Sequence, residues 1–215
     1  MIYDSSFPNG LEEKNLQGNN STVKNAPQLK MVPLLPDIQF DEFPQNHNMH
    51  ITTDGVKYYT INGGNAGIGQ INEFDLTGAF IQTDTILIDG RGLSYNKADG
   101  FLYASLYARD IVRIDNLAAG TFTTIFTNAM QNDQASFAIS NDGTKYFDFY
   151  AGTLLIHDFF TGAVINTITG LNYGPGNFGG EEAVAVDSLY IFTWDATIKT
   201  VSKYDMTGNL LSLIH

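Results

Sequence analysis

Short apolar segments alternate with polar turns along most of this chain, and their lengths are those of β-strands. Segments such as Met49–Thr53, Lys57–Asn62 and Lys145–Tyr150 are followed or preceded by Asp-Gly or Asn-Asp-Gly turns. Apolar runs of this length between tight turns are typical of antiparallel hairpins. We find no helical periodicity that extends beyond two turns. The pattern therefore predicts an all-β protein.

The expected strands fall into four groups of four. The first two groups are Met49–Thr53, Lys57–Asn62, Gln70–Asp75 and Ala79–Thr83, then Leu93–Asn96, Phe101–Tyr107, Ile111–Asp115 and Thr121–Phe126. The last two are Ser136–Ser140, Lys145–Tyr150, Leu154–Asp158 and Ala163–Thr169, then Ala183–Val186, Leu189–Trp194, Ile198–Asp205 and Asn209–Ile214. Each group reads as a four-stranded antiparallel meander, within repeats 47–84, 90–127, 134–169 and 181–215.

The four groups share an Asp that precedes a Gly turn, at Asp75, Asp115, Asp158 and Asp205. These residues are 40, 43 and 47 positions apart, and a strand-rich period of this length is typical of β-propeller blades. The strands carry large apolar residues on both faces, which requires cover on both sides of each sheet. Blades stacked face to face around an axis supply that cover, so the sequence predicts a propeller of about four blades.

The repeat resembles that of NHL/YVTN-like propellers and of the wider group that includes gluconolactonase-like and virginiamycin B lyase-like proteins. The matching phrases are Ile51-Thr52-Thr53-Asp54-Gly55, Phe74-Asp75-Leu76-Thr77-Gly78, Ala138-Ile139-Ser140-Asn141-Asp142-Gly143 and Tyr204-Asp205-Met206-Thr207-Gly208. The resemblance covers residues 47–215 and implies rings of six or seven blades, whereas four are found here. We therefore expect a small ring, an open arc, or part of a larger propeller.

The first 45 residues differ from the rest, since five of the six prolines lie there. Proline cannot donate to a β-ladder, so this stretch is a poor central strand. We interpret residues 1–45 as a flexible lead-in followed by an extended strap over 29–43, and residues 46–215 as the propeller repeats.

Charge narrows the range of partners. Eleven basic and 23 acidic residues give a net charge of −12, which argues against nucleic acid and anionic membrane surfaces. No apolar run is long enough to span a bilayer. The chain has no cysteine, so disulfides, thiolate zinc sites and a thiol nucleophile are excluded. Richness in Gly, Asn, Thr and Tyr resembles exported bacterial β proteins, which favours a secreted or extracytoplasmic location.

Polar residues from all four repeats converge where the innermost strand of each blade begins. They are His47, Asn48, His50, Arg91, Gln134, Ser136, Glu181 and Glu182. One interpretation is a divalent metal held by His47, His50, Glu181 and Glu182, because imidazole and carboxylate together suit several ions. A second makes His50 or Glu182 a general base, with Arg91 holding an anionic substrate. The third is a wet channel lined by ordinary polar residues, and no cofactor is then required.

Two loops and two polar residues also bear on structure and function. The long loop 172–180 carries Tyr173 and Phe178 among glycines, and exposed aromatic rings there suit sugar or peptide contacts. The Gly-rich loop 63–69 leads into a strand rather than a helix, which argues against a phosphate site. Asp148 interrupts an aromatic strand and needs a hydrogen-bond partner such as a Tyr hydroxyl or a backbone N–H. His157, near a strand end, is expected to be exposed.

No complete catalytic set is present, so the sequence favours a non-enzymatic propeller that binds a ligand or protein through its loop face and channel mouth. Its partners would be a protein, peptide or glycan, and exposed blade edges would allow homo-oligomers. The alternative is a metal-dependent hydrolase or lyase whose site lies at the channel mouth.

Overall fold

The computed structural model describes residues 48–63, 69–174 and 183–214, which form strands joined by turns. Within these ranges no helix is long and apolar enough to cross a membrane. The all-β expectation is confirmed. The proposed lead-in and strap over residues 1–45 lie outside the described residues.

Sixteen strands form four four-stranded sheets, which we number as blades 1 to 4. Blade 1 contains β1 (Asn48–Thr53), β2 (Lys57–Asn62), β3 (Gln70–Asp75) and β4 (Phe80–Thr85), and blade 2 contains β5 (Gly90–Asn96), β6 (Phe101–Leu106), β7 (Ile111–Asn116) and β8 (Thr121–Phe126). Blade 3 contains β9 (Ser136–Ile139), β10 (Lys145–Tyr150), β11 (Thr153–Asp158) and β12 (Val164–Thr169), and blade 4 contains β13 (Ala183–Val186), β14 (Tyr190–Asp195), β15 (Thr200–Asp205) and β16 (Leu210–Ile214).

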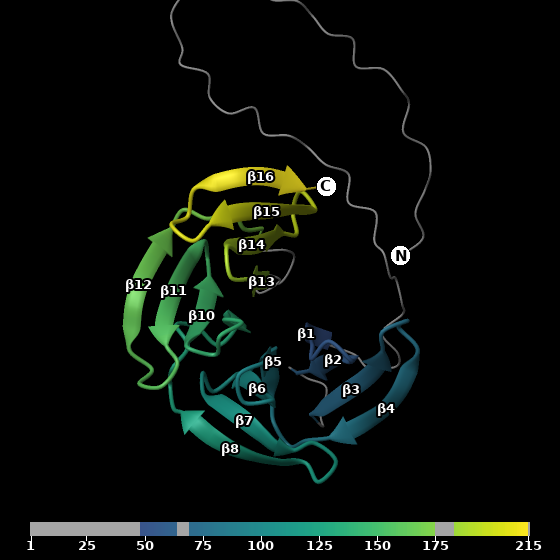
Figure 1. The fold of residues 1–215 in the computed structure, drawn as a ribbon. Helices are drawn as coiled ribbons and strands as arrows, with labels where there is room; N and C mark the ends of the chain where they lie inside the picture. Colours follow the sequence, from purple (N-terminus) through teal and green to yellow (C-terminus); the bar gives the residue numbers. More distant parts are fainter. Residues whose placement is uncertain (1–47, 64–68, 175–182, 215) are drawn as a thin grey trace, which may run out of the picture.

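Each blade is an antiparallel meander in which the strands neighbour one another in sequence order. Figure 1 shows the blades arranged as a propeller, with β1, β5, β9 and β13 nearest the common axis and β4, β8, β12 and β16 at the rim. The predicted four-bladed propeller is therefore confirmed.

The turns explain the repeated Asp-to-Gly phrase. In blade 1, Asp75 Oδ1 accepts the backbone N–H groups of Thr77 (2.8 Å) and Ala79 (3.0 Å), while Gly78 adopts a φ of 84°. A short carboxylate can satisfy turn N–H groups in this way, and glycine takes the left-handed conformation without a steric penalty. Asp205 makes the same bonds in blade 4. In blade 2 the cap comes from Asn116, whose Oδ1 accepts the N–H of Ala119 at 3.0 Å.

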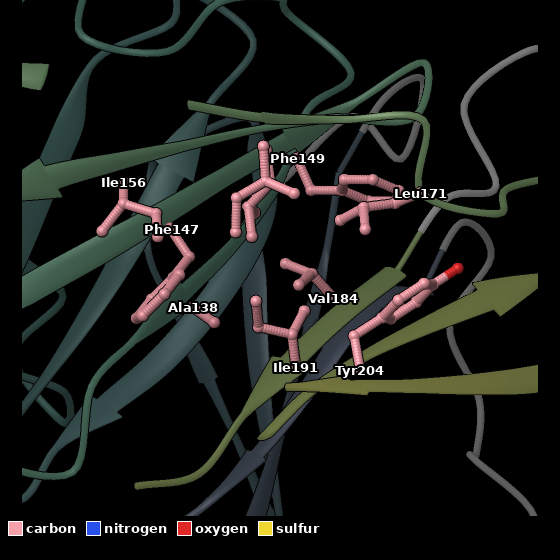
Figure 2. Close-up of a cluster of buried hydrophobic side chains, with 10 residues drawn as sticks. Ala138, Phe147, Phe149, Ile156, Leu171, Val184, Ile191 and Tyr204 are labelled. Carbon is pink, nitrogen blue, oxygen red and sulfur yellow. The ribbon is translucent and has the colours of Figure 1, made fainter. Parts of the chain in front are cut away.

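The faces of the blades pack against one another through apolar cores. In β10, Phe147 and Phe149 face blade 4, while Tyr146 lies in the core shared with blade 2. Figure 2 shows Phe147 and Phe149 of blade 3 near Val184, Ile191 and Tyr204 of blade 4. Similar cores join blade 1 to blade 2 and blade 2 to blade 3. Each fully buried large side chain stabilises the fold by about 1.5–3 kcal/mol. These three junctions therefore hold the four blades together.

The junction between blade 4 and blade 1 is built differently. Among the described residues, no cluster of buried apolar side chains joins these two blades. A groove of about 270 Å³ lies there instead, and its walls come from β1 and from β13, β14 and β15. We call it the junction groove.

Blade 3 also carries a buried polar group in its junction with blade 2. Asp148 is fully buried, and its carboxylate accepts the backbone N–H of Gln131 at 2.7 Å, which confirms the expected type of partner. The expectation for His157 is wrong: only 4% of it is exposed, because its ring stacks on Tyr146 (centroids 4.2 Å apart) and its Nδ1 bonds the Gly162 carbonyl. Burial, followed by the nearby Asp148 carboxylate, raises the pKa of Tyr146.

Candidate functional site on the propeller axis

A pocket of about 350 Å³ lies on the propeller axis, and the innermost strands of all four blades line it. We call it the axial pocket. Its polar lining consists of His50, Thr52, Thr53, Ser94 and Asn141, and two tyrosines, Tyr58 and Tyr95, also border it. Apolar residues from β9 and β13 complete the wall. Hydroxyl, amide and aromatic groups are thus presented together in one concave site.

Three hydroxyls near the axis connect consecutive blades, and we call them the interblade hydroxyls. Thr52 Oγ1 of β1 accepts the N–H of Tyr95 in β5 at 3.1 Å. Ser94 Oγ of β5 accepts the N–H of Ile139 in β9, and Ser136 Oγ of β9 accepts the N–H of Val184 in β13, both at 3.0 Å. Each bond satisfies a backbone donor of an innermost strand that its own sheet does not use. The interblade hydroxyls therefore set how the innermost strands lie relative to one another.

His50 is the candidate residue that reaches the axial pocket, and it also lines the junction groove. Burial lowers the pKa of its imidazole, and hydrogen bonds to the backbone of Leu93 and Ile51 oppose that shift only in part. The ring is therefore neutral at pH 7. Its Nδ1 is buried and has no hydrogen-bond partner in the described part of the chain. A neutral ring with one nitrogen bonded to a carbonyl leaves the other nitrogen as an acceptor.

Arg91 and Gln134 meet, as their place at the start of innermost strands suggests. Arg91 Nη1 donates to Gln134 Oε1 at 3.3 Å, and its Nη2 lies 3.2 Å from Asp89 Oδ2. The guanidinium also lies 4.7 Å from the centroid of the Tyr107 ring. Only 10% of the Arg91 side chain is exposed, so its charge is already balanced by a carboxylate within the protein. In this arrangement Arg91 links blade 2 to the loop before β9.

The remaining predicted site residues are divided between described and undescribed segments. Tyr173 is 39% exposed, and its ring lies beside Gly152 in the turn between β10 and β11. His47, Phe178, Glu181 and Glu182 lie outside the described residues. Within residues 48–63, 69–174 and 183–214, no group of three His, Asp or Glu side chains is placed to hold a metal ion. The metal prediction rests mainly on undescribed residues and remains a prediction.

Sequence reasoning missed most of the axial pocket. Thr52, Ser94, Tyr95 and Asn141 lie near the ends of innermost strands, whereas the predicted candidates cluster at their beginnings. Hydroxyl residues occur in three of the four innermost strands, but at different distances from the turn that follows, so the sequence alone did not mark them.

Comparison with known proteins gives the fold. No protein-family model matches the sequence. No curated protein matches it either. Among solved structures, a chain of a nidogen–laminin complex aligns with a TM-score of 0.54 and 13% identity, over 77% of this chain and 62% of its own length. A protein of unknown function from Bacteroides caccae aligns with a TM-score of 0.52 and 10% identity, over 78% of this chain and 66% of its own length.

A third solved structure, of a functionally unknown protein from Desulfotomaculum acetoxidans, has a TM-score of 0.51 and 13% identity, over 79% of this chain and 72% of its own. The chain spans about half the length of two further solved chains that it matches, 49% and 47%. At these identities the likeness concerns the fold alone. The comparisons agree with a propeller and do not distinguish the NHL-like, gluconolactonase-like and lyase-like subtypes.

Proposed function

We propose that this protein is a non-enzymatic binding domain that takes its partner in the axial pocket and at the adjoining channel mouth. The observation that carries the proposal is the axial pocket itself, to which all four blades contribute. Its volume of about 350 Å³ falls within the range of about 300–1,000 Å³ that is usual for ligand sites. A mostly apolar wall with a few placed polar groups is the usual composition of such sites.

The lining favours a protein, peptide or glycan partner. Tyr58 and Tyr95 offer aromatic faces, and Asn141 offers an amide donor and acceptor. An interblade hydroxyl that accepts a backbone N–H retains its own O–H for donation. One matched fold belongs to a complex between two proteins, nidogen and laminin, which is in keeping with a protein partner. The net charge of −12 disfavours nucleic acid and favours neutral or basic partners.

Binding to arrays of glycans and of linear peptides tests the proposal. Tyr95→Ala and Asn141→Ala each remove a side chain from the axial pocket, and we expect affinity to fall at least about tenfold in each, which is about 1.4 kcal/mol. Phe160→Ala is the matched control, because this aromatic residue is exposed in a turn of blade 3. Circular dichroism confirms that each variant is folded. Unchanged binding in both axial variants contradicts the proposal.

The long loop is tested in the same experiment. Tyr173→Ala and Phe178→Ala weaken binding if the partner extends from the axis to the channel mouth. A loss in these two variants without a loss in Tyr95→Ala would move the site away from the axis.

The alternative, a metal-dependent hydrolase or lyase, has a separate test. Thermal unfolding is followed with EDTA and with added Ca²⁺, Mg²⁺ or Zn²⁺, and elemental analysis measures bound metal. A metal-dependent rise in Tm that His50→Ala abolishes favours the enzyme.

We also propose that the rim strands allow self-association. Phe80, Ile81, Val164 and Ile165 are exposed on or beside the outermost strands β4 and β12, whose edges can pair with another strand. Sedimentation velocity over a range of concentrations tests this, and a single monomeric species throughout contradicts it.

A further inference from the structure

The junction groove differs from the other three blade junctions in its hydrogen bonding as well as in its packing. The innermost strands of blades 1, 2 and 3 each supply one interblade hydroxyl. The innermost strand of blade 4, β13, reads Ala-Val-Ala-Val and has no hydroxyl. It therefore cannot accept an N–H from β1 as its counterparts accept one from the next blade. Nothing in β13 closes the fourth junction in the way that the others are closed.

The walls of the junction groove are almost entirely apolar. β1 contributes Met49 and Ile51, while β14 contributes Phe192 and Trp194. Next to them, the outward face of blade 4 continues with Tyr190, whose ring lies 3.5 Å from the Lys203 ammonium nitrogen. These three aromatic rings are half-buried. A concave apolar surface lined by partly accessible aromatic rings is typical of a site that receives a bulky apolar side chain.

The junction groove and the axial pocket adjoin each other. His50, Ile51, Val184 and Ala185 line both. At this shared wall the buried Nδ1 of His50 is an acceptor without a donor in the described part of the chain. A buried acceptor left unpaired is unfavourable, so a ligand that donates a hydrogen bond there gains in affinity.

We propose that the junction groove is the anchor site for an extended peptide segment of a partner protein. A bulky apolar side chain of that segment enters the groove, and its backbone continues into the axial pocket, where one N–H is donated to His50 Nδ1. This rests on the proposed function and names the partner class for the same site.

Three observations favour a peptide over the other occupants. A glycan has hydroxyls where this groove offers Met49, Ile51, Phe192 and Trp194, so it would leave those hydroxyls unpaired. A peptide supplies both an apolar side chain and backbone N–H groups at the spacing of an extended chain. A second copy of this chain carries the same charge of −12, whereas a neutral or basic segment suits both that charge and the apolar wall.

Selection from a phage-displayed library of linear peptides tests the proposal. We expect the enriched peptides to share a large apolar or aromatic residue and to lack acidic residues beside it. The tightest is then synthesised with a fluorescent label and titrated against the variants by fluorescence anisotropy.

Ala183→Trp fills the junction groove without altering the axial pocket, because Ala183 lines the groove but does not line the axial pocket. We expect it to weaken binding at least about tenfold. Ala163→Trp, at an exposed site before β12, is the matched control and should bind as the wild type does. If Ala183→Trp does not fold, Trp194→Ala opens the groove wall and provides the same readout. His50→Phe should weaken binding while keeping an aromatic ring at that position.

The outcomes separate the two proposals. Binding that Asn141→Ala abolishes and that Ala183→Trp and Trp194→Ala leave unchanged overturns the anchor site but keeps the axial site. Failure of the wild type to enrich peptides, together with selective glycan binding, overturns the peptide proposal and leaves the binding domain intact. Self-association that Ala183→Trp abolishes would instead assign the groove to a second copy and overturn the peptide proposal.

Discussion

Three junctions of this propeller contain a buried apolar core and a hydroxyl that accepts a backbone N–H, whereas the fourth contains a groove. The contrast is seen by comparing the two faces of blade 4. Phe147 of blade 3 is fully buried against blade 4, while Phe192 and Trp194, on the other face of blade 4, line the junction groove. The two faces of blade 4 thus differ: one packs in the core shared with blade 3, and the other lines the junction groove.

The largest expected effect separates the two faces of blade 4. Phe147→Ala removes a fully buried ring from the core between blades 3 and 4 and should lower the free energy of unfolding by about 3–5 kcal/mol. Trp194→Ala removes a ring from the junction groove and should cost less than about 2 kcal/mol, because this side chain is only partly buried. Urea unfolding monitored by circular dichroism measures both. Equal losses would mean that the fourth junction is also a stabilising core.

A smaller effect is expected at the interblade hydroxyls. Ser94→Ala and Ser136→Ala each leave a buried N–H, that of Ile139 or Val184, without its acceptor. Each should lower the free energy of unfolding by about 1–3 kcal/mol. Ser212→Ala on the outermost strand β16 is the control and should change it by less than about 0.5 kcal/mol. A cost at Ser94 and Ser136 no greater than the control would remove their proposed role in joining the blades.

The turn carboxylates should show their effect through pH. Hydrogen bonds lower the pKa of Asp142 to about 2, the largest contribution coming from Ser140 and the next from Thr144. Since the folded-state pKa lies below the unfolded value of about 3.9, this carboxylate stabilises the fold above pH 4, and the contribution is lost as the pH falls through about 2. Asp142→Ala should therefore be less stable than the wild type at pH 7 by an amount that disappears near pH 2. A difference that persists at the lowest pH would point to packing instead.

The smallest expected effect is at the fourth junction itself. Ala185→Ser places a hydroxyl on β13, at an exposed position beside the junction groove. We expect the free energy of unfolding to change by less than about 0.5 kcal/mol, as at other exposed positions. A gain of about 1 kcal/mol or more would indicate that the new hydroxyl accepts a hydrogen bond from β1 and that the junction can be closed.

The strands could be predicted because turns and apolar periods are local properties of the sequence. Lys145–Tyr150 and Gln70–Asp75 have the same bounds in the structure as in the prediction, and most others differ by one to three residues. The interblade hydroxyls could not be assigned in this way. Thr52 lies two residues before its Asp turn, whereas Ser136 lies six before its own, so no common spacing marks them. Their role depends on how one blade is placed against the next.

His157 shows the other limit. Strand alternation places His157 on the other face of β11 from the apolar residues Leu154 and Ile156. Such a face normally points to solvent. In a propeller both faces of a blade are covered, so the face of His157 lies against blade 2 and holds Tyr146 and Asp148. Of the site, the sequence located His50 at the axis, but the axial pocket and junction groove depend on contacts between blades.

The hydrogen bonds made by the interblade hydroxyls all run in the same direction along the sequence. Each acceptor lies on the earlier blade and each donor on the later one, from Thr52 to Tyr95, from Ser94 to Ile139 and from Ser136 to Val184. A chain that leaves the ribosome N-terminus first therefore presents the acceptor before the strand that needs it has been synthesised. Each completed sheet can serve as a template for its successor, but the innermost strand of blade 4 contains only alanine and valine and offers no such hydroxyl.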